Sequence, residues 1–185
     1  MEDKPSIEQI SHLFRLIGDG SCTRTNLQAY LEKPNGLIDK SVSTTAIIIT
    51  MDCTRSLKEM IKAGRYDWTN SDIKDKNFPI TEKGVFNTEA VLVHYNKVMK
   101  TEDILRDMES KGLVQGKIEH LLAVGEKYPN LQRDFPIVAL GSSWQDPVGF
   151  RVVPYLSGDD SGRGLSLVWS DRDWDEDYRF LAVRK

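Results

Sequence analysis

The C-terminal segment of the chain, residues 165–185, constrains the fold more than any other stretch of the sequence. Apolar and polar side chains alternate at its start, which is the period of a strand with one buried face. The alternation predicts three inward and three outward side chains: Leu165, Leu167 and Trp169 inward, and Ser166, Val168 and Ser170 outward. A second apolar stretch, residues 180–183, closes the segment. We therefore expect one face of the C-terminus to belong to the core and the other to meet solvent.

An acidic loop lies between these two stretches. Its carboxylates are Asp171, Asp173, Asp175, Glu176 and Asp177. Glu176 and Asp177 are expected to face solvent, because burying an unpaired charge costs several kcal/mol, and Arg172 is expected on the same face. Trp174 is expected in the core. Arg179 is expected to donate to several loop carbonyls through its planar guanidinium, which is a structural role.

The spacing of Asp171, Asp173 and Asp175 is similar to the start of an EF-hand calcium loop. Such a loop needs glycine at its sixth position and a bidentate glutamate at its twelfth. This chain has Glu176 and Ala182 there, so the EF-hand is excluded. An irregular calcium site remains an alternative, because carboxylate oxygens need only converge on the ion.

Length and composition limit the class of function. The 185 residues suffice for one sizeable core, and 39% hydrophobic with 29% charged residues is typical of a soluble globular protein. The formal net charge is -3 with no basic face, so we expect no nucleic-acid partner. The longest apolar run, Ala46–Ile49, is too short to cross a membrane. No apolar signal segment follows the polar start, and a cytoplasmic protein is expected.

Catalytic and metal-binding patterns are not recognisable. Cys22 and Cys53 predict unpaired thiols in a reducing compartment. The three histidines do not stand at metal-ligand spacing, so we expect neither a metal nor another cofactor. Ser142 and Ser143 follow a glycine but lack the second glycine of a nucleophile elbow. No nucleophile–base pair can be named, and we expect a protein without enzymatic activity.

Hydrophobic periodicity divides the chain into a helical N-terminal region, residues 1–43, and an α+β domain, residues 44–185. The N-terminal region is predicted to hold amphipathic helices at 5–17 and 24–32. The domain is predicted to hold the following elements: a central strand at 44–51, a strand at 89–95, helices at 56–63, 101–111 and 117–127, and a β-hairpin over 137–156. Thr101 is the expected N-cap of its helix.

The order of elements after residue 104 carries a resemblance. Two helices lead to Leu140-Gly141-Ser142-Ser143-Trp144, then to RVVPYL at 151–156, and the chain ends in WSDRDWDEDYRFLAVRK. This arrangement resembles the C-type-lectin-like fold in the version shared by formylglycine-generating enzymes and the variable proteins of diversity-generating retroelements. It is also similar to bacterial proteins for which the resemblance implies no activity.

The resemblance implies binding rather than catalysis. The enzyme branch of the group uses cysteines in its C-terminal half, and this chain has none after Cys53. The calcium-binding motifs Glu-Pro-Asn and Trp-Asn-Asp of sugar-binding relatives are absent. Trp144-Gln145-Asp146 is only weakly similar to the second motif. The variable-protein branch remains. In it, exposed positions of the last segment differ among copies while a framework of Trp, Leu and Arg stays fixed.

These observations predict an α+β, C-type-lectin-like domain that binds a protein or other macromolecular ligand without catalysis. The predicted binding patch is one solvent-facing set: Ser166, Val168, Ser170, Arg172, Glu176 and Asp177. The alternative is a calcium- or carbohydrate-dependent binder that uses Asp171, Asp173 and Asp175. Neither reading names the ligand.

Overall fold

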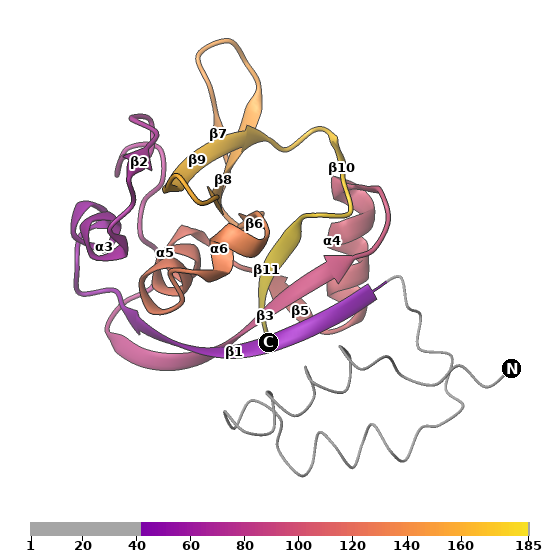
Figure 1. Cartoon of the computed structure of the whole chain (residues 1–185), viewed down its shortest axis with the longest axis horizontal. Helices are drawn as coiled ribbons and strands as arrows, with labels where there is room; N and C mark the ends of the chain where they lie inside the picture. The colour runs from indigo at the N-terminus through magenta and orange to yellow at the C-terminus, as the bar shows by residue number, and fades with distance from the viewer. Residues whose placement is uncertain (1–41, 185) are drawn as a thin grey trace, which may run out of the picture. The chain divides into compact units, whose positions relative to one another are not determined.

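A computed structural model describes residues 42–184, which belong to one compact unit that extends from Lys40 to Lys185. The predicted helices at 5–17 and 24–32, and Cys22, lie outside the described residues. The unit combines one large sheet with a few helices, which confirms the α+β class (Figure 1). Within residues 42–184, no helix is both long enough and apolar enough to cross a membrane.

The helices and strands alternate irregularly along the unit. The helices are α3 (Leu57–Gly64), α4 (Thr101–Ser110), α5 (Ile118–Lys127) and α6 (Leu131–Asp134). The strands are β1 (Val42–Asp52), β2 (Trp68–Thr69), β3 (Val85–Tyr95), β4 (Met99–Lys100), β5 (Leu113–Gln115), β6 (Ile137–Val138), β7 (Trp144–Gln145), β8 (Arg151–Gly158), β9 (Arg163–Trp169), β10 (Asp173–Trp174) and β11 (Arg179–Arg184). The predicted helices and strands of this region are confirmed, with ends that agree to within four residues.

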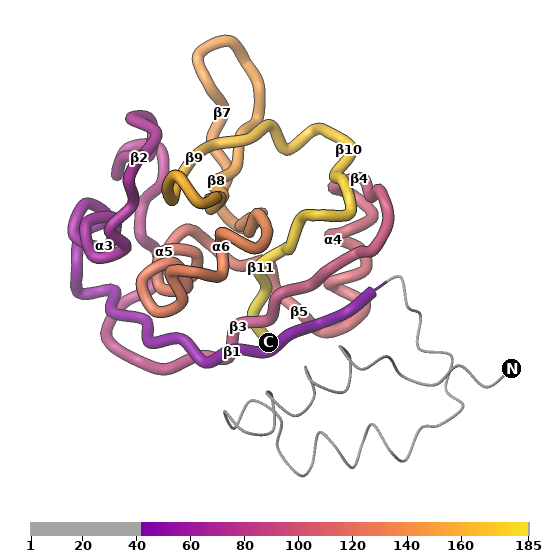
Figure 2. The backbone as a smooth tube through the Cα atoms, in the orientation of Figure 1, coloured from indigo at the N-terminus to yellow at the C-terminus, as the bar shows by residue number. Residues whose placement is uncertain are grey.

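Nine of the described strands form one sheet. Seven of the nine follow the order β1-β3-β11-β6-β8-β9-β2, and the other two pair beside this path, β5 with β11 and β7 with β8. The strands β10 and β4 form a separate two-stranded ribbon. The predicted hairpin is confirmed, because β6 and β7 both pair antiparallel with β8. Figure 2 traces the C-terminal strand β11 alongside β3, its antiparallel neighbour.

The first strand does not have its expected place. We predicted a central strand at 44–51 because of its apolar run. The strand exists as β1, but it lies at one end of the strand order. An apolar run indicates that the side chains of a strand can be buried on one or both faces of the sheet. It carries no information about whether one or both edges of that strand are paired with neighbouring strands.

The central strands of the sheet are buried on both faces, and their alternate residues enter different cores. Leu92 of β3, Leu181 of β11 and Ile137 of β6 pack with helices α3 and α5. Their sequence neighbours pack on the other face with α4: Val91, Val93, Phe180, Ala182 and Val138. The period of two along each strand therefore divides the apolar residues between two clusters.

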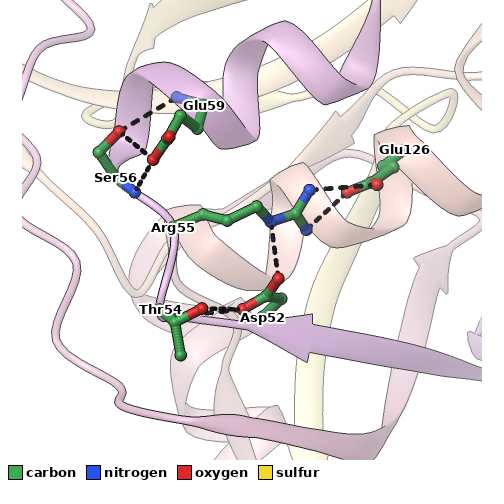
Figure 3. A network of polar contacts seen from close by, with 6 residues as sticks. All are labelled: Asp52, Thr54, Arg55, Ser56, Glu59 and Glu126. Atoms are coloured by element: carbon green, nitrogen blue, oxygen red, sulfur yellow. Dashed lines mark hydrogen bonds and ion pairs between the residues drawn. The ribbon is translucent and has the colours of Figure 1, made fainter.

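A polar network joins the loop after β1 to α5 (Figure 3). The Arg55 guanidinium donates to both carboxylate oxygens of Glu126, at 3.2 and 2.8 Å, and its Nε lies 3.2 Å from Oδ2 of Asp52. Ser56 caps α3, and its backbone N–H donates to the Glu59 carboxylate at 2.8 Å in a capping box. The network fixes where α3 begins relative to α5.

Arg163 joins the C-terminal ends of the same two helices. Its guanidinium donates to the carbonyl oxygens of Gly64 and Gly125, at 2.8 and 2.7 Å, and to Oε1 of Gln132 at 3.0 Å. These carbonyls lie at the C-terminal ends of α3 and α5, where the helix dipoles favour a cation. The Tyr66 ring packs under the guanidinium, and a Cβ on either glycine would lie within 2.5 Å of a Tyr66 atom. Arg163 is 7% exposed.

Candidate binding face

The strands β7, β8 and β9 and the loop after β2 enclose an open pocket of about 360 Å³, here called the β7–β9 groove. Its lining residues come from these elements: Asn70, Asp72, Trp144, Asp146, Val152, Leu167, Val168, Trp169 and Arg172. The lining combines aromatic and aliphatic side chains with two carboxylates, an amide and a guanidinium. This mixture is typical of sites that recognise a ligand.

Two stacked aromatic rings stand exposed beside the groove. The rings of Phe150 and Trp169 are 5.0 Å apart between centroids, with an angle of 28° between their planes. Phe150 is 50% exposed and Trp169 is 57% exposed. Val148, at 77% exposure, extends the apolar surface along the same turn. Single exposed apolar residues are ordinary on a protein surface, whereas a contiguous exposed group marks an interaction site.

The turn that carries Phe150 is fixed by its own hydrogen bonds. Oδ1 of Asp146 accepts from the backbone N–H groups of Val148 and Phe150, at 3.0 and 2.8 Å. The Gln145 side chain donates to the Gly149 carbonyl at 3.0 Å. Gly149 has a positive φ of 98°, a backbone conformation in which a residue with a side chain would be strained. The turn projects away from the helices in Figure 1. Phe150 is therefore displayed in one conformation rather than on a loose loop.

Arg172 is held at the other side of the groove. Its guanidinium lies 5.4 Å from the ring centre of Trp174 and 5.5 Å from that of Tyr178. Asp175 stands 3.9 Å away, at the limit of an ion pair. The Arg172 Nε donates to the Asp173 carbonyl at 3.3 Å, and the ring contacts leave the Nη donors for a ligand carboxylate or carbonyl.

The structure distributes the six predicted binding residues over different environments. Glu176 and Asp177 are exposed, and Ser166, Val168 and Arg172 are half-buried. Only Val168 and Arg172 line the groove. The expected solvent exposure of Ser170 is wrong, since this residue is 6% exposed. Its backbone N–H and its hydroxyl both donate to the Arg151 carbonyl, at 2.9 and 3.2 Å. Ser170 is the first residue after β9, so the alternation of the strand no longer applies to it.

The inward set is also partly wrong. Leu165 is fully buried and Leu167 packs against the same core, as expected. Trp169 instead stands out into solvent against Phe150. The expected burial of Trp174 is confirmed: it is fully buried, and its Nε1 donates to the Thr101 hydroxyl at 2.8 Å.

Arg179 has the predicted structural role. Its Nη1 donates to the carbonyl oxygens of Glu176, Asp177 and Tyr178, at 3.3, 2.9 and 3.3 Å. Burial lowers the pKa of the guanidinium below its ordinary value, with Asp177 acting in the opposite direction. Nε2 of His94 lies 2.8 Å from the Glu176 carbonyl, so the same loop is held from β3 as well.

Acidic side chains of the loop do not gather into a metal site. Within residues 42–184, no group of three or more His, Cys, Asp or Glu residues is arranged to hold a metal ion. Asp171, Asp173 and Asp175 are each exposed to solvent. They lie in the segment that follows β9 in the chain.

Cys53 is half-buried and has no disulfide partner among the described residues. Burial raises the pKa of its thiol, and the carboxylates of Glu119 and Glu82 raise it further. A thiol with a raised pKa is a poor nucleophile at neutral pH.

Comparisons of the chain with protein-family models, with curated proteins and with solved structures found no match.

Proposed function

We propose that the chain is a non-enzymatic binding protein whose β7–β9 groove takes a protein partner, with Phe150 and Trp169 as the anchoring side chains. The observation that carries the proposal is the exposed, stacked pair on a fixed turn next to a groove. Trp, Tyr and Arg dominate the energetic centres of protein interfaces, and both Trp169 and Arg172 line this groove. Displaying Phe150 on a hydrogen-bonded turn reduces the entropy lost on binding.

The charge beside the groove favours a basic partner. Asp171, Asp173 and Asp175 are exposed and follow directly after Trp169 in the chain. Complementary charge at the edge of an interface raises the association rate more than the final affinity, and salt weakens the effect. Association should therefore slow as the salt concentration rises, while the dissociation rate changes little.

The proposal includes a C-type-lectin-like fold of the variable-protein branch. The order of elements supports it: α4 and α5 are followed by β6, the β7–β8 hairpin, β9 and the terminal β11, which returns beside β3. Of the six positions predicted from the sequence, we retain Val168 and Arg172 as ligand-contacting residues, and we add Trp169 and Phe150. A reverse transcriptase gene and an imperfect second copy of the 3′ coding end near the gene would support this branch. Their absence would contradict the branch but not the binding.

Affinity capture with the wild-type chain and with Trp169→Ala tests the proposed function. Trp68→Ala is the matched control, because Trp68 is also exposed, at 56%, but does not line the groove. A protein enriched by the wild type and by Trp68→Ala, and lost with Trp169→Ala, is then purified and titrated directly. If no purified candidate binds the wild type, or if Trp169→Ala retains the full set of captured proteins, the proposed function is wrong.

A further inference from the structure

The strand β1 is long and, within residues 42–184, pairs on one side only. It pairs with β3 over eleven consecutive positions, from Val42 opposite Tyr95 to Asp52 opposite Val85. The register runs one to one without a bulge. The other edge of β1 therefore presents backbone N–H and C=O groups along its length, which is a template for pairing with another strand. The carbonyl oxygen of Ile48 is already an acceptor, from the Tyr128 hydroxyl at 2.9 Å.

The usual protections of an edge strand are missing from β1. Natural edge strands are short, or they carry charges, prolines or bulges that prevent further pairing. Residues 42–51 contain no charged residue and no proline. The opposite end of the sheet shows the contrast, since the last strand there, β2, has only two residues. An open, uncharged edge at one end alone indicates that this edge has a partner.

We propose that β1 pairs antiparallel with β1 of a second copy of this chain, about a two-fold axis. Antiparallel pairing in a continuous sheet brings residues of the same face opposite one another. The exposed members of the outer face are Thr44, Ala46, Ile48 and Thr50. Self-pairing of these residues gives neutral and β-branched contacts, which are favourable across strands, and no like charges meet. The sequence before β1 predicts helices rather than a further strand.

Pairing at β1 leaves the β7–β9 groove free. The strands β1 and β9 lie near opposite ends of the strand order, with β3, β11, β6 and β8 between them. A dimer through β1 would carry two grooves at the two far ends of one continuous sheet. Two such sites on one particle bind a multivalent or surface-displayed partner more tightly than either site alone, without any new contact. The pairing itself does not depend on what the groove binds.

Light scattering coupled to size-exclusion chromatography of the full chain tests the pairing. The expected mass is twice 21.1 kDa, falling toward 21.1 kDa only on dilution. Ala46→Lys and Thr44→Glu should each give a monomer, because a charged side chain on an edge strand opposes pairing with another strand. Val98→Lys is the control: Val98 is 62% exposed and lies outside β1, so this variant should remain a dimer.

Two results would overturn the proposal. One is a wild-type chain that stays a monomer throughout the dilution series. The other is a dimer that persists in both β1 variants while their circular dichroism and melting match the wild type. Amide hydrogen exchange gives a second reading, because β1 amides on the open edge should be protected in the wild type and exchange faster in the folded Ala46→Lys monomer.

Discussion

The indole Nε1 of Trp174 donates to the hydroxyl of Thr101 at 2.8 Å, and that hydroxyl donates to the carbonyl oxygen of Ser170. One side chain at the start of α4 therefore connects to both ends of the loop that follows β9. We had predicted Thr101 as the N-cap of its helix, but its side chain makes no capping bond, and Lys100 takes the cap position. The hydroxyl instead positions the acidic loop beside the groove.

Thr101→Val should destabilise the protein by about 1–3 kcal/mol, because it leaves the Trp174 indole N–H without an acceptor and the Ser170 carbonyl without this donor. Valine has nearly the shape of threonine, so packing is preserved. Urea unfolding of the variant beside Thr101→Ser measures the effect, since serine keeps the hydroxyl. Equal stability of Thr101→Val and the wild type would show that the hydroxyl has no structural role.

The two tryptophans of the C-terminal segment should respond oppositely to truncation. Trp174→Ala empties a fully buried site and should cost about 3–5 kcal/mol of unfolding free energy. Trp169→Ala removes an exposed ring and should change stability by about 0.5 kcal/mol, as surface substitutions do. Chemical denaturation of both variants makes the comparison. A large loss for Trp169→Ala would mean that its stack on Phe150 stabilises the fold rather than displaying a surface.

Arg163→Leu should cost more than about 3 kcal/mol, because three buried acceptors lose their donor and each unsatisfied group costs about 1–3 kcal/mol. The acceptors are the carbonyls of Gly64 and Gly125 and the side chain of Gln132. Arg163→Lys keeps the charge but cannot span all three groups, so its stability should lie between the other two proteins. Thermal melting of the three proteins checks the predicted order, in which the wild type melts highest, Arg163→Lys next and Arg163→Leu lowest. An Arg163→Leu variant that melts like the wild type would contradict the prediction.

Stability should fall as the pH drops below the ordinary histidine range. Burial lowers the pKa of His120 below 6.5, and burial followed by the charge of Arg179 lowers the pKa of His94. Between the lowered pKa of each histidine in the folded state and its ordinary pKa in the unfolded state, the unfolded chain binds more protons than the folded one. Acid therefore favours unfolding in that range. Unfolding free energies between about pH 7.5 and about pH 5.5 should decrease in the wild type and change less in the double variant His94→Gln/His120→Gln. An identical slope in both proteins would exclude this cause.

The strand faces could be predicted from sequence wherever the covering layer extends along the whole strand. Leu165 is buried as its alternation indicates, and the apolar end of the chain enters both cores. Trp169 follows the same period and is nevertheless exposed. Periodicity gives the side of the sheet on which a residue lies, but it does not tell how far the helices on that side reach. Trp169 comes at the last position of β9, and its ring packs against Phe150 of the projecting turn.

The long-range polar contacts had no local signal. Arg163 lies in a loop-like stretch of glycine, serine and aspartate, and its partners are backbone carbonyls far away in the chain. A glycine near a helix end permits close approach of another group, but it does not identify that group. The groove was missed for a similar reason, because Asn70 and Asp72 come from a loop that pairs with β9 only in the fold.

The most direct test of the binding face is the affinity of a purified partner for single-residue variants, measured by calorimetry. Removal of an anchoring aromatic at the centre of an interface costs about 2 kcal/mol or more, which is more than tenfold in Kd. Trp169→Ala and Phe150→Ala should each weaken binding by at least this factor while melting like the wild type, and Trp68→Ala should bind normally. Binding that survives both groove substitutions, or that is lost in Trp68→Ala instead, would contradict the β7–β9 groove as the site.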